Sequence, residues 1–446
     1  MNENTYGSLR VVDHPLRIAE LPVKRRFFLQ KKFHFYLTLA VIATTLFSWF
    51  NINSYLIILL LLCRLLDGQP ADNLKTAFSN KYFLAYFSVF LLDFIGLFYT
   101  HHFYTGWKHM ESKATLVAIP FIVCSGPFTD SAGYRRLLSA YCLLLAAICG
   151  YCLSMAMIEY RWQHTVSVFF YHDLTSAVSV NAVFFSGYVI VALLFLLFSS
   201  LSLPPILSPS GTKWLRNGLI FFFTGIMILL SSKLLLVLLA VIFLFYLGSR
   251  NRLWLSKRQF SGLALLALIG ILTLALTNNP VSHRYEETLS HYSHNNIYTE
   301  FNGVNLRARQ WRFAYEILNE NHAWAFGVSA GDSQDLLDQK YLAAGMSQGY
   351  LSYNFHNEYI EVLVRSGLVG SCIFLLAIAG MIGLARSAAA VEAAFTVTLA
   401  LLVMLTESAL EMQHTLFLFS FFPLLTASQS PFRTHFRPLF QSKRVS

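Results

Sequence analysis

Charged residues are scarce in this chain: they make up 13% of its 446 residues, whereas hydrophobic residues make up 56%. Soluble globular domains contain about 25% charged residues, so the composition excludes an ordinary soluble protein. Cysteines are also few, and all six lie within or beside apolar stretches, which excludes a disulfide framework outside a membrane. Walker loops, HExxH motifs and His–Cys metal clusters are missing as well. The sequence therefore predicts no cofactor and no metal site.

Long apolar segments are abundant instead. A helix needs about 20 apolar residues to cross a hydrocarbon core of about 30 Å, and the chain contains twelve candidate spans, two of them short. The predicted fold is therefore all-α: a polytopic integral membrane bundle of about twelve transmembrane helices with one large, partly helical loop. The twelve predicted spans are 33–50, 53–66, 82–99, 114–127, 136–158, 177–201, 215–231, 233–248, 259–277, 358–384, 388–408 and 413–428.

The distribution of Lys and Arg orients these spans, because basic residues accumulate on the cytoplasmic side of short loops. If the N-terminus is cytoplasmic, 23 of the 33 basic residues lie on that side and 16 of the 23 acidic residues lie on the other. Topology and contact with membrane lipid headgroups then explain the net charge of +10, and no nucleic-acid partner is expected. The predicted segments are a cytoplasmic N-terminus (1–32), transmembrane helices 1–9 (33–277), an outer lid loop (278–357), transmembrane helices 10–12 (358–428) and a cytoplasmic tail (429–446).

The lid loop, residues 278–357, is the single long connection between the predicted spans. Long loops in compact proteins are usually functional or disordered. This one has a helical pattern at 307–318 and turn signals at Phe326-Gly327 and Ala330-Gly331-Asp332. These features predict a small folded lid over the outer membrane surface.

The lid ends at His356-Asn357, where apolar sequence resumes, and Gly367 and Gly370 follow. The N-terminus of a helix carries partial positive charge, which favours a bound anion such as pyrophosphate and a neutral imidazole suited to a general base. Asn354 or Asn357 could cap the helix. We expect the two glycines to hold this helix against the bundle, because small residues let neighbouring backbones approach closely. From these residues alone, a structural hydrogen-bonding role is the commoner one for such a histidine.

Two cations are expected on the same outer side as His356. Arg307 lies four residues before Trp311, so both share a helix face, and a guanidinium binds phosphate through two hydrogen bonds. Lys233 stands between two apolar spans, where a charge is costly unless it reaches water or a partner. Contact with lipid headgroups for Arg307 and snorkelling to the membrane surface for Lys233 are the simpler alternatives.

Weaker indications point to further substrate contacts. Arg309 shares the lid helix with Arg307, although a solvated face or lipid contact explains it as well. His172 lies in an outer loop, where capping of a helix is an equal alternative. The candidate substrate-binding residues are Asn357, Trp311, Arg309 and His172.

Two acidic residues, Glu407 and Glu411, share a helix face near the outer end of the eleventh predicted span. In a plausible bundle they come within reach of Lys233 or Arg307. We therefore expect them to be ion-pair partners before catalysts.

The pattern His356-Asn357-x9-Gly367-x2-Gly370 resembles the motif of the O-antigen ligase superfamily. The same superfamily contains O-antigen polymerases and some protein O-oligosaccharyltransferases. Arg307-x3-Trp311 and the segment 326–332 add to the resemblance, which covers roughly 215–425. It implies a multi-pass glycosyltransferase of the bacterial inner membrane with its site on the periplasmic face. Its partners would be an undecaprenyl diphosphate-linked glycan and the lipid A core or another glycan acceptor.

By this resemblance, the family's essential histidine is His356 and its lid arginine is Arg307. The family usually has a further arginine where this chain has Lys233, which keeps the charge but loses the two-pronged guanidinium. Arg307 and Lys233 would stabilise the leaving pyrophosphate. His356 would accept the proton of the acceptor hydroxyl, or would instead be a cationic pyrophosphate ligand; the sequence leaves this choice open.

Polymerisation, protein glycosylation and transport are the alternative functions. The single dominant outer loop favours a ligase over a polymerase. A transporter or flippase would require ionisable residues near the bilayer midplane and paired broken helices. Asp93 and Glu392 are the nearest candidates for such residues, and both fall closer to the ends of their spans than to the centres.

Overall fold

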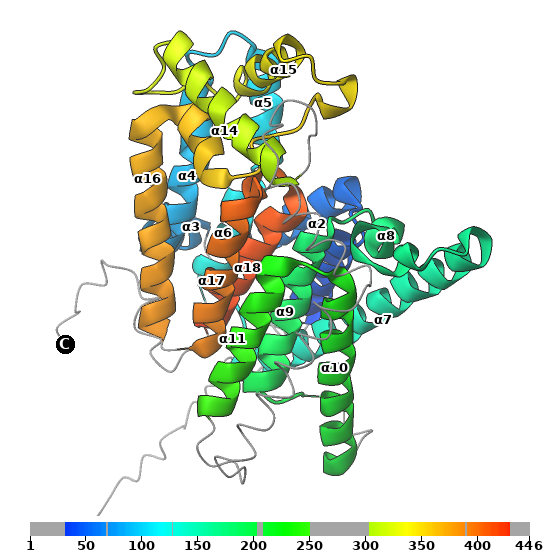
Figure 1. The fold of residues 1–446 in the computed structure, drawn as a ribbon. Helices are drawn as coiled ribbons and strands as arrows, with labels where there is room; N and C mark the ends of the chain where they lie inside the picture. Colours follow the sequence, from blue (N-terminus) through cyan, green and yellow to red (C-terminus); the bar gives the residue numbers. More distant parts are fainter. Residues whose placement is uncertain are drawn as a thin grey trace, which may run out of the picture.

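Helices account for all the regular structure in the part of the chain that the structure describes (Figure 1). The structure is a computed structural model, and it describes residues 32–67, 70–126, 128–202, 208–249, 303–388 and 390–428. Over these ranges no strand occurs, so the predicted all-α class is confirmed. Apolar segments fold this way because a helix satisfies its backbone hydrogen bonds internally, which lipid requires.

The helices follow one another in short succession. The first is Lys32–Leu46. The following elements are α2 (Phe50–Leu65), α3 (Pro70–Phe78), α4 (Lys81–Gly96), α5 (Phe103–Ser112), α6 (Thr115–Cys124), α7 (Ser131–Gln163), η1 (Val166–Phe169), α8 (Tyr171–Thr175), η2 (Ser176–Val178), α9 (Ala182–Phe198), α10 (Pro209–Leu230) and α11 (Lys233–Ser249). The C-terminal part contains α14 (Gly303–Glu320), α15 (Ser333–Ala343), η4 (Gln348–Tyr350), α16 (Glu358–Ala388), α17 (Val391–Thr406), η5 (Ala409–Glu411) and α18 (Gln413–Ser428).

A helix lies at eleven of the twelve predicted spans. The remaining span, 259–277, lies outside the described residues, as do residues 1–31, 278–302 and 429–446 of the predicted end segments and lid. By length and apolar character, α7, α10 and α16 are able to cross a membrane, and two bent helix pairs raise this number to five. The described helices therefore support a membrane protein with three to five spans, and the full count of twelve stays a prediction.

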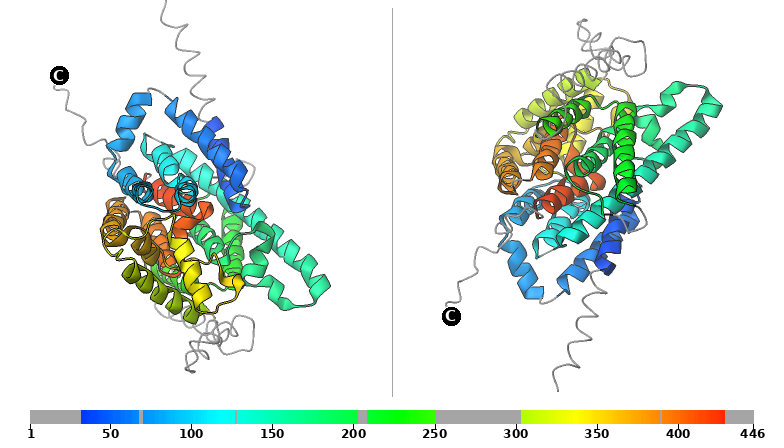
Figure 2. Two further views of the ribbon diagram at one scale, coloured as in Figure 1. Left: turned by 90° about the horizontal axis from the view of Figure 1, so that it is seen from above. Right: turned by 90° about the horizontal axis from the view of Figure 1, so that it is seen from below.

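Two helices, α9 and α18, form the centre of the bundle. Nearly every residue of both is buried, which is the pattern of a helix that is apolar on all sides. Both views in Figure 2 place α18, in orange-red, among the other helices. The buried hydroxyls of Tyr86 and Tyr188 donate to backbone carbonyls of this helix, those of Phe419 and His414.

The lid covers one end of the bundle, where α14, α15 and α5 lie beyond α16 and α17 (Figure 1). The predicted helical pattern at 307–318 falls within α14. The lid has an apolar core of its own, separate from that of the bundle, and its buried residues include Phe313, Ile317, Tyr341 and Phe355. It is therefore a folded unit and not an irregular strap.

The lid is hydrogen-bonded to a break in α16. Gly367 has φ 62° and ψ −165°, outside helical values, and a Cβ there would overlap the backbone of Ala325 in the lid. The Leu368 N–H donates to the Trp324 carbonyl at 2.8 Å. We expected Gly367 to face the bundle, and this was wrong: it receives the lid, because only glycine adopts this backbone conformation without strain.

Gly370 has a different environment from Gly367. Its neighbours are the side chain of Ser366, one turn earlier in α16, and that of Leu92 on α4. This glycine therefore faces the bundle, as the spacing predicted, and α16 packs along α4 there.

A second attachment joins the lid to the loop between α4 and α5. The Asp332 carboxylate accepts the backbone N–H groups of His101 and His102 at 2.9 Å each, and the hydroxyl of Thr100 at 3.2 Å. Burial alone would raise the pKa of Asp332, but these donors hold it below its ordinary value. The charged carboxylate thus anchors the lid at neutral pH.

Candidate functional site

The centre of the candidate site is the carboxylate of Glu407, which contacts both Arg307 and His356. Oε1 accepts a hydrogen bond from Arg307 Nη2 at 3.1 Å. Oε2 lies 3.1 Å from Nδ1 of His356. One carboxylate therefore joins the lid helix α14 to the turn that precedes α16.

The end of α17 places Glu407 in this position. The helix ends at Thr406, and Glu407 takes an extended conformation with φ −145° and ψ 146°, which turns its side chain towards the lid. Arg307 Nη2 also donates to the Thr406 carbonyl at 3.2 Å. A cation is stabilised there because the C-terminus of a helix carries partial negative charge.

His356 is held by its own backbone as well as by Glu407. Its φ is 48°, in the left-handed region, and its N–H donates to Oδ1 of Asn354 at 3.1 Å. Asn357 follows and caps α16, because its Oδ1 accepts the Ile360 N–H at 3.1 Å. The same side chain donates to the Leu405 carbonyl at 3.0 Å, which ties the turn to α17.

The imidazole of His356 has one ring nitrogen engaged. Nδ1 faces Glu407, whereas Nε2 makes no hydrogen bond to the chain segments that the structure describes. The side chain is 26% exposed, and Tyr353 packs edge-on against the ring at 5.9 Å between centroids. A carboxylate at Nδ1 favours the tautomer with its proton there and leaves Nε2 able to accept one.

The lid helix contacts this turn through Trp311 as well as through Arg307. The indole Nε1 donates to the Phe355 carbonyl at 3.2 Å, next to His356. Arg307 is 31% exposed, so its guanidinium lies at the boundary between protein and surroundings. The structure thus brings Arg307, Trp311, His356 and Asn357 together. Arg309 lies half-buried on the same helix, and its proposed contact with substrate stays a prediction.

Lys233 and His172 occupy other elements. Lys233 is the half-buried first residue of α11, a helix that packs against α9 and α17. Its role in binding phosphate stays a prediction. His172 is in α8, and its Nδ1 accepts the N–H of Ala182, the first residue of α9, at 3.3 Å. This is the capping contact that we named as the alternative to substrate binding.

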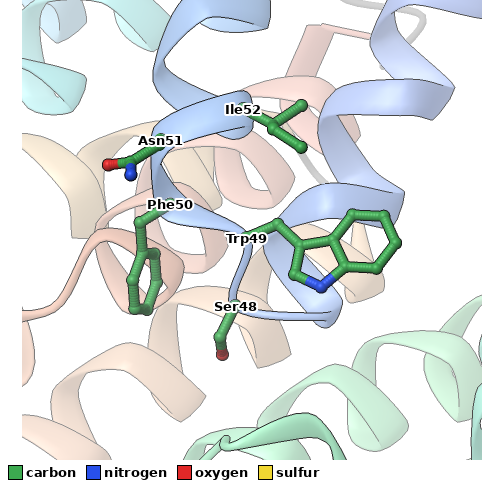
Figure 3. A pocket seen from close by; sticks show the side chains of 5 residues that line it. All are labelled: Ser48, Trp49, Phe50, Asn51 and Ile52. Atoms are coloured by element: carbon green, nitrogen blue, oxygen red, sulfur yellow. The ribbon is translucent and has the colours of Figure 1, made fainter.

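A pocket lies at the turn between the first helix and α2, beside the start of α18. Its lining is the consecutive run Ser48, Trp49, Phe50, Asn51 and Ile52, and Figure 3 shows the rings of Trp49 and Phe50 on either side of Ser48. Phe50 stacks on His414 at 5.8 Å. The lining belongs to one turn and includes none of the residues around Glu407, so the pocket and the candidate site are separate features.

Sequence reasoning found part of this arrangement. The expected pairing of Glu407 with Arg307 is confirmed. The contact between Glu407 and His356 was missed, because nothing in the local sequence joins residues 51 positions apart. The buried charges of Glu361 and Arg365 were also missed. The signal was present in their i, i+4 spacing at the start of an apolar run, since ionisable residues in such segments usually have a function.

Comparison with known families identifies the region that carries the motif. The O-antigen ligase family model matches residues 218–375, about a third of the chain. Over this region the chain is similar to the O-antigen ligase family. The match confirms the resemblance stated from the motif, and it includes Lys233, Arg307 and His356 but ends before Glu407. No curated protein matches the chain.

The O-antigen ligase domain and the apolar helices together indicate a bacterial membrane protein of the glycosyltransferase type. Partners of this family are, in general terms, a lipid-linked glycan and an acceptor.

Proposed function

We propose that this protein transfers a glycan from undecaprenyl diphosphate to a sugar hydroxyl, as an O-antigen ligase-type glycosyltransferase that requires no metal. The observation that carries the proposal is the Glu407 carboxylate between Arg307 and His356. It joins a cation suited to a diphosphate with an imidazole suited to a general base. Both belong to the matched domain.

In the proposed reaction, His356 acts as the base. Nε2 takes the proton from the acceptor hydroxyl while the hydroxyl oxygen forms a bond to the anomeric carbon of the donor sugar. The bond from that carbon to the diphosphate oxygen breaks, and its electron pair leaves with undecaprenyl diphosphate. Glu407 stabilises the imidazolium that forms. General-base assistance of this kind contributes about 10²–10⁴-fold to the rate.

Fixed cations stabilise the departing diphosphate in this proposal. Arg307 presents a partly exposed guanidinium, and Lys233 would supply a second charge through a single contact. Donors held in place before the reaction need little rearrangement as charge develops on the leaving group. Trp311, Arg309 and Asn357 would line the same region, although Asn357 acts mainly through the cap that it gives α16.

The site would face the periplasm in a bundle of twelve transmembrane helices. The lid lies beyond the apolar helices at one end of the bundle, and most Lys and Arg residues belong to the segments assigned to the opposite side. The N-terminal segment and the tail would then be cytoplasmic. A lipid-linked donor and a lipid A core acceptor would both reach the lid from the outer leaflet of the inner membrane.

A deletion strain tests the reaction and its closest alternatives. Gel profiles of surface polysaccharide and of carrier-linked glycan should show long polymer on the carrier and a bare core. Single repeat units on the core would indicate a polymerase, an unchanged core with an unglycosylated protein would indicate protein glycosylation, and glycan trapped on the cytoplasmic side would indicate a transporter.

His356→Ala tests the proposed base within the same strain. We expect transfer to be lost while the amount of protein in the membrane is unchanged, because the side chain is partly exposed and not part of an apolar core. Near-normal transfer by this variant would overturn the general-base role.

A further inference from the structure

The first two turns of α16 hold the segment that carries Glu407. Glu358 and Glu361 are both fully buried. Oε2 of Glu358 accepts the Leu410 N–H at 2.7 Å. Oε2 of Glu361 accepts the Ser408 hydroxyl at 2.9 Å, one residue after Glu407. Two buried carboxylates on one helix therefore fix the link between α17 and α18.

The same oxygen of Glu361 also contacts the segment that carries His356. It accepts the backbone N–H of Phe355 at 3.3 Å, one residue before His356. Glu361 is thus bonded to the neighbour of each partner in the His356–Glu407 contact. A single carboxylate oxygen connects the two segments whose separation sets that contact.

Arg365 holds Glu361 from the other side. Its Nη2 lies 2.6 Å from Oε1 of Glu361. Its two terminal nitrogens bind the carboxylate of Glu411 at 2.5 and 2.8 Å. A planar guanidinium fixes both the distance and the direction of such contacts. We call Glu361, Arg365 and Glu411 the clasp.

Charges from α4 and the end of α5 surround the clasp. Lys113 Nζ lies 3.1 Å from Asp93 and 3.2 Å from Glu411. His109 Nε2 lies 2.7 Å from Arg365, and its Nδ1 lies 3.4 Å from Glu411. Burial alone would raise the pKa of Glu411, but the Arg365 guanidinium holds it well below its ordinary value. The Glu411 carboxylate is therefore charged at neutral pH.

Stability alone does not account for the clasp. Buried ion pairs are often no more stabilising than apolar residues of similar volume, because their desolvation cost offsets the attraction. What ion pairs add is a fixed geometry. Here the fixed contacts extend to the residues next to His356 and Glu407. His356 is the partly exposed partner in the candidate site, and Glu407 is the nearly buried one.

We propose that Glu361 is a positioning residue for glycan transfer, whose carboxylate sets the separation of His356 from Glu407 by binding the residues next to each. This inference rests on the function proposed above. Glu361 has no contact with substrate in this proposal and acts only through the two segments that it joins.

A matched pair of serine variants tests the proposal. Ser408 and Ser333 are both buried, and both bind the clasp, but only Ser408 is next to a site residue. Ser333 Oγ accepts a 3.3 Å hydrogen bond from Arg365 Nε. Ser408→Ala should lower kcat severalfold with an unchanged KM for the acceptor, whereas Ser333→Ala should leave both within about twofold, as expected for a change remote from the reacting groups.

Glu361→Gln gives the larger change. An amide cannot accept from Phe355 and Ser408 on one side and from Arg365 on the other, so the two segments should shift. A displacement of about 1 Å can cost about 100-fold in rate, and we expect kcat to fall by about 10–100-fold. The KM for the acceptor should stay within about twofold, because Glu361 makes no contact with substrate in this proposal.

The assay uses purified full-length protein, undecaprenyl diphosphate-linked glycan extracted from the deletion strain, and the bare lipid A core of the same strain. If Glu361→Gln lowers only the yield of folded protein, with kcat of the purified protein unchanged, the clasp is merely structural and the proposal is overturned. Equal effects of Ser408→Ala and Ser333→Ala would also overturn it. Failure of the proposed function is seen separately, as normal transfer by His356→Ala.

Discussion

Two groups of charged residues lie close together at the start of α16, and they differ in burial. Around Glu407, Arg307 and His356 keep about a quarter to a third of their side chains exposed. In the clasp, no side chain of Glu361, Arg365 or Glu411 is more than 12% exposed. The exposed group is able to meet a substrate, and the buried group is able only to set geometry. The same residue types therefore have different consequences when they are replaced.

The largest expected effect is that of Glu407→Gln, which breaks the exposed group at its centre. The amide oxygen can still accept from Arg307, but the NH₂ group then faces Nδ1 of His356 and favours the wrong tautomer. A wrong tautomer in a comparable histidine–carboxylate pair costs about 10⁴-fold in kcat, and we expect a loss of about 10²–10⁴-fold. Transfer by purified protein measures this.

Glu316→Gln is the matched control for that change. Glu316 also lies between two cations, Arg312 at 2.9 Å and Lys340 at 3.3 Å, but on the lid surface. Transfer by Glu316→Gln should equal that of the unmodified protein. Equal losses of transfer activity in both variants would mean that any change of charge near the lid impairs the protein. The specific role proposed for Glu407 would then be contradicted.

The two arginines provide the next comparison. Arg365→Met leaves the buried Glu361 carboxylate without its cation and removes one of the cations beside Glu411, so it should destabilise the protein by about 3–5 kcal/mol. Arg307→Met removes a partly exposed pair and should cost about 1 kcal/mol or less, yet it should abolish transfer. Thermal unfolding in detergent and transfer activity, measured side by side, test this. Full transfer activity in folded Arg365→Met protein would contradict the assignment of the clasp to geometry.

A smaller, pH-dependent effect should come from His109. Burial, with the Arg365 guanidinium beside it, lowers the pKa of His109 to about 4 from an ordinary value of 6.5. Arg365, Glu411, Lys113 and Asp93 are the charged groups that face it. Between pH 6.5 and pH 4, the unfolded chain binds a proton at His109 more readily than the folded protein does. The neutral histidine therefore contributes its full stabilisation above pH 6.5, and roughly 3 kcal/mol of folding free energy is lost as the pH falls towards 4.

The pH dependence of the melting temperature of His109→Gln tests this linkage. The variant should lose less stability than the unmodified protein between pH 6.5 and 4, because it has no imidazole to protonate. Identical pH profiles would show that His109 is not the titrating group. The Asp332 anchor should persist over the same range, since its lowered pKa keeps it charged.

The smallest expected change is that of Lys233→Arg. If Lys233 contacts the diphosphate, an arginine at this position should retain or improve transfer, because the guanidinium offers two parallel donors. The KM for the donor glycan, measured in the same assay, should be equal or lower. A clear loss of activity would indicate a site shaped for an ammonium group.

Some of this site could be predicted from sequence and some could not. His356 and Asn357 lie where polar sequence meets an apolar run. A polar residue at such a boundary is typical of a helix cap, so the start of α16 could be predicted there. Gly367 was recognised as a position of close approach, but its partner was assigned to the bundle and proved to be the lid backbone at Ala325. A glycine in a motif shows that the backbone is special there, and it does not show which segment approaches it.

By itself, the sequence determined the class of the protein, the positions of eleven apolar helices and the motif shared with the O-antigen ligase family, because apolar runs and capping residues act over short distances along the chain. The tertiary structure alone decided that Glu407 meets His356 and that Arg365 joins Glu361 to Glu411. The contacts of His356 with Glu407 and of Arg365 with Glu411 link residues 51 and 46 positions apart, and they depend on how α16 and the α17–α18 link pack. Local periodicity fixes each helix, whereas the pairing of their ends follows from packing, which no local pattern encodes.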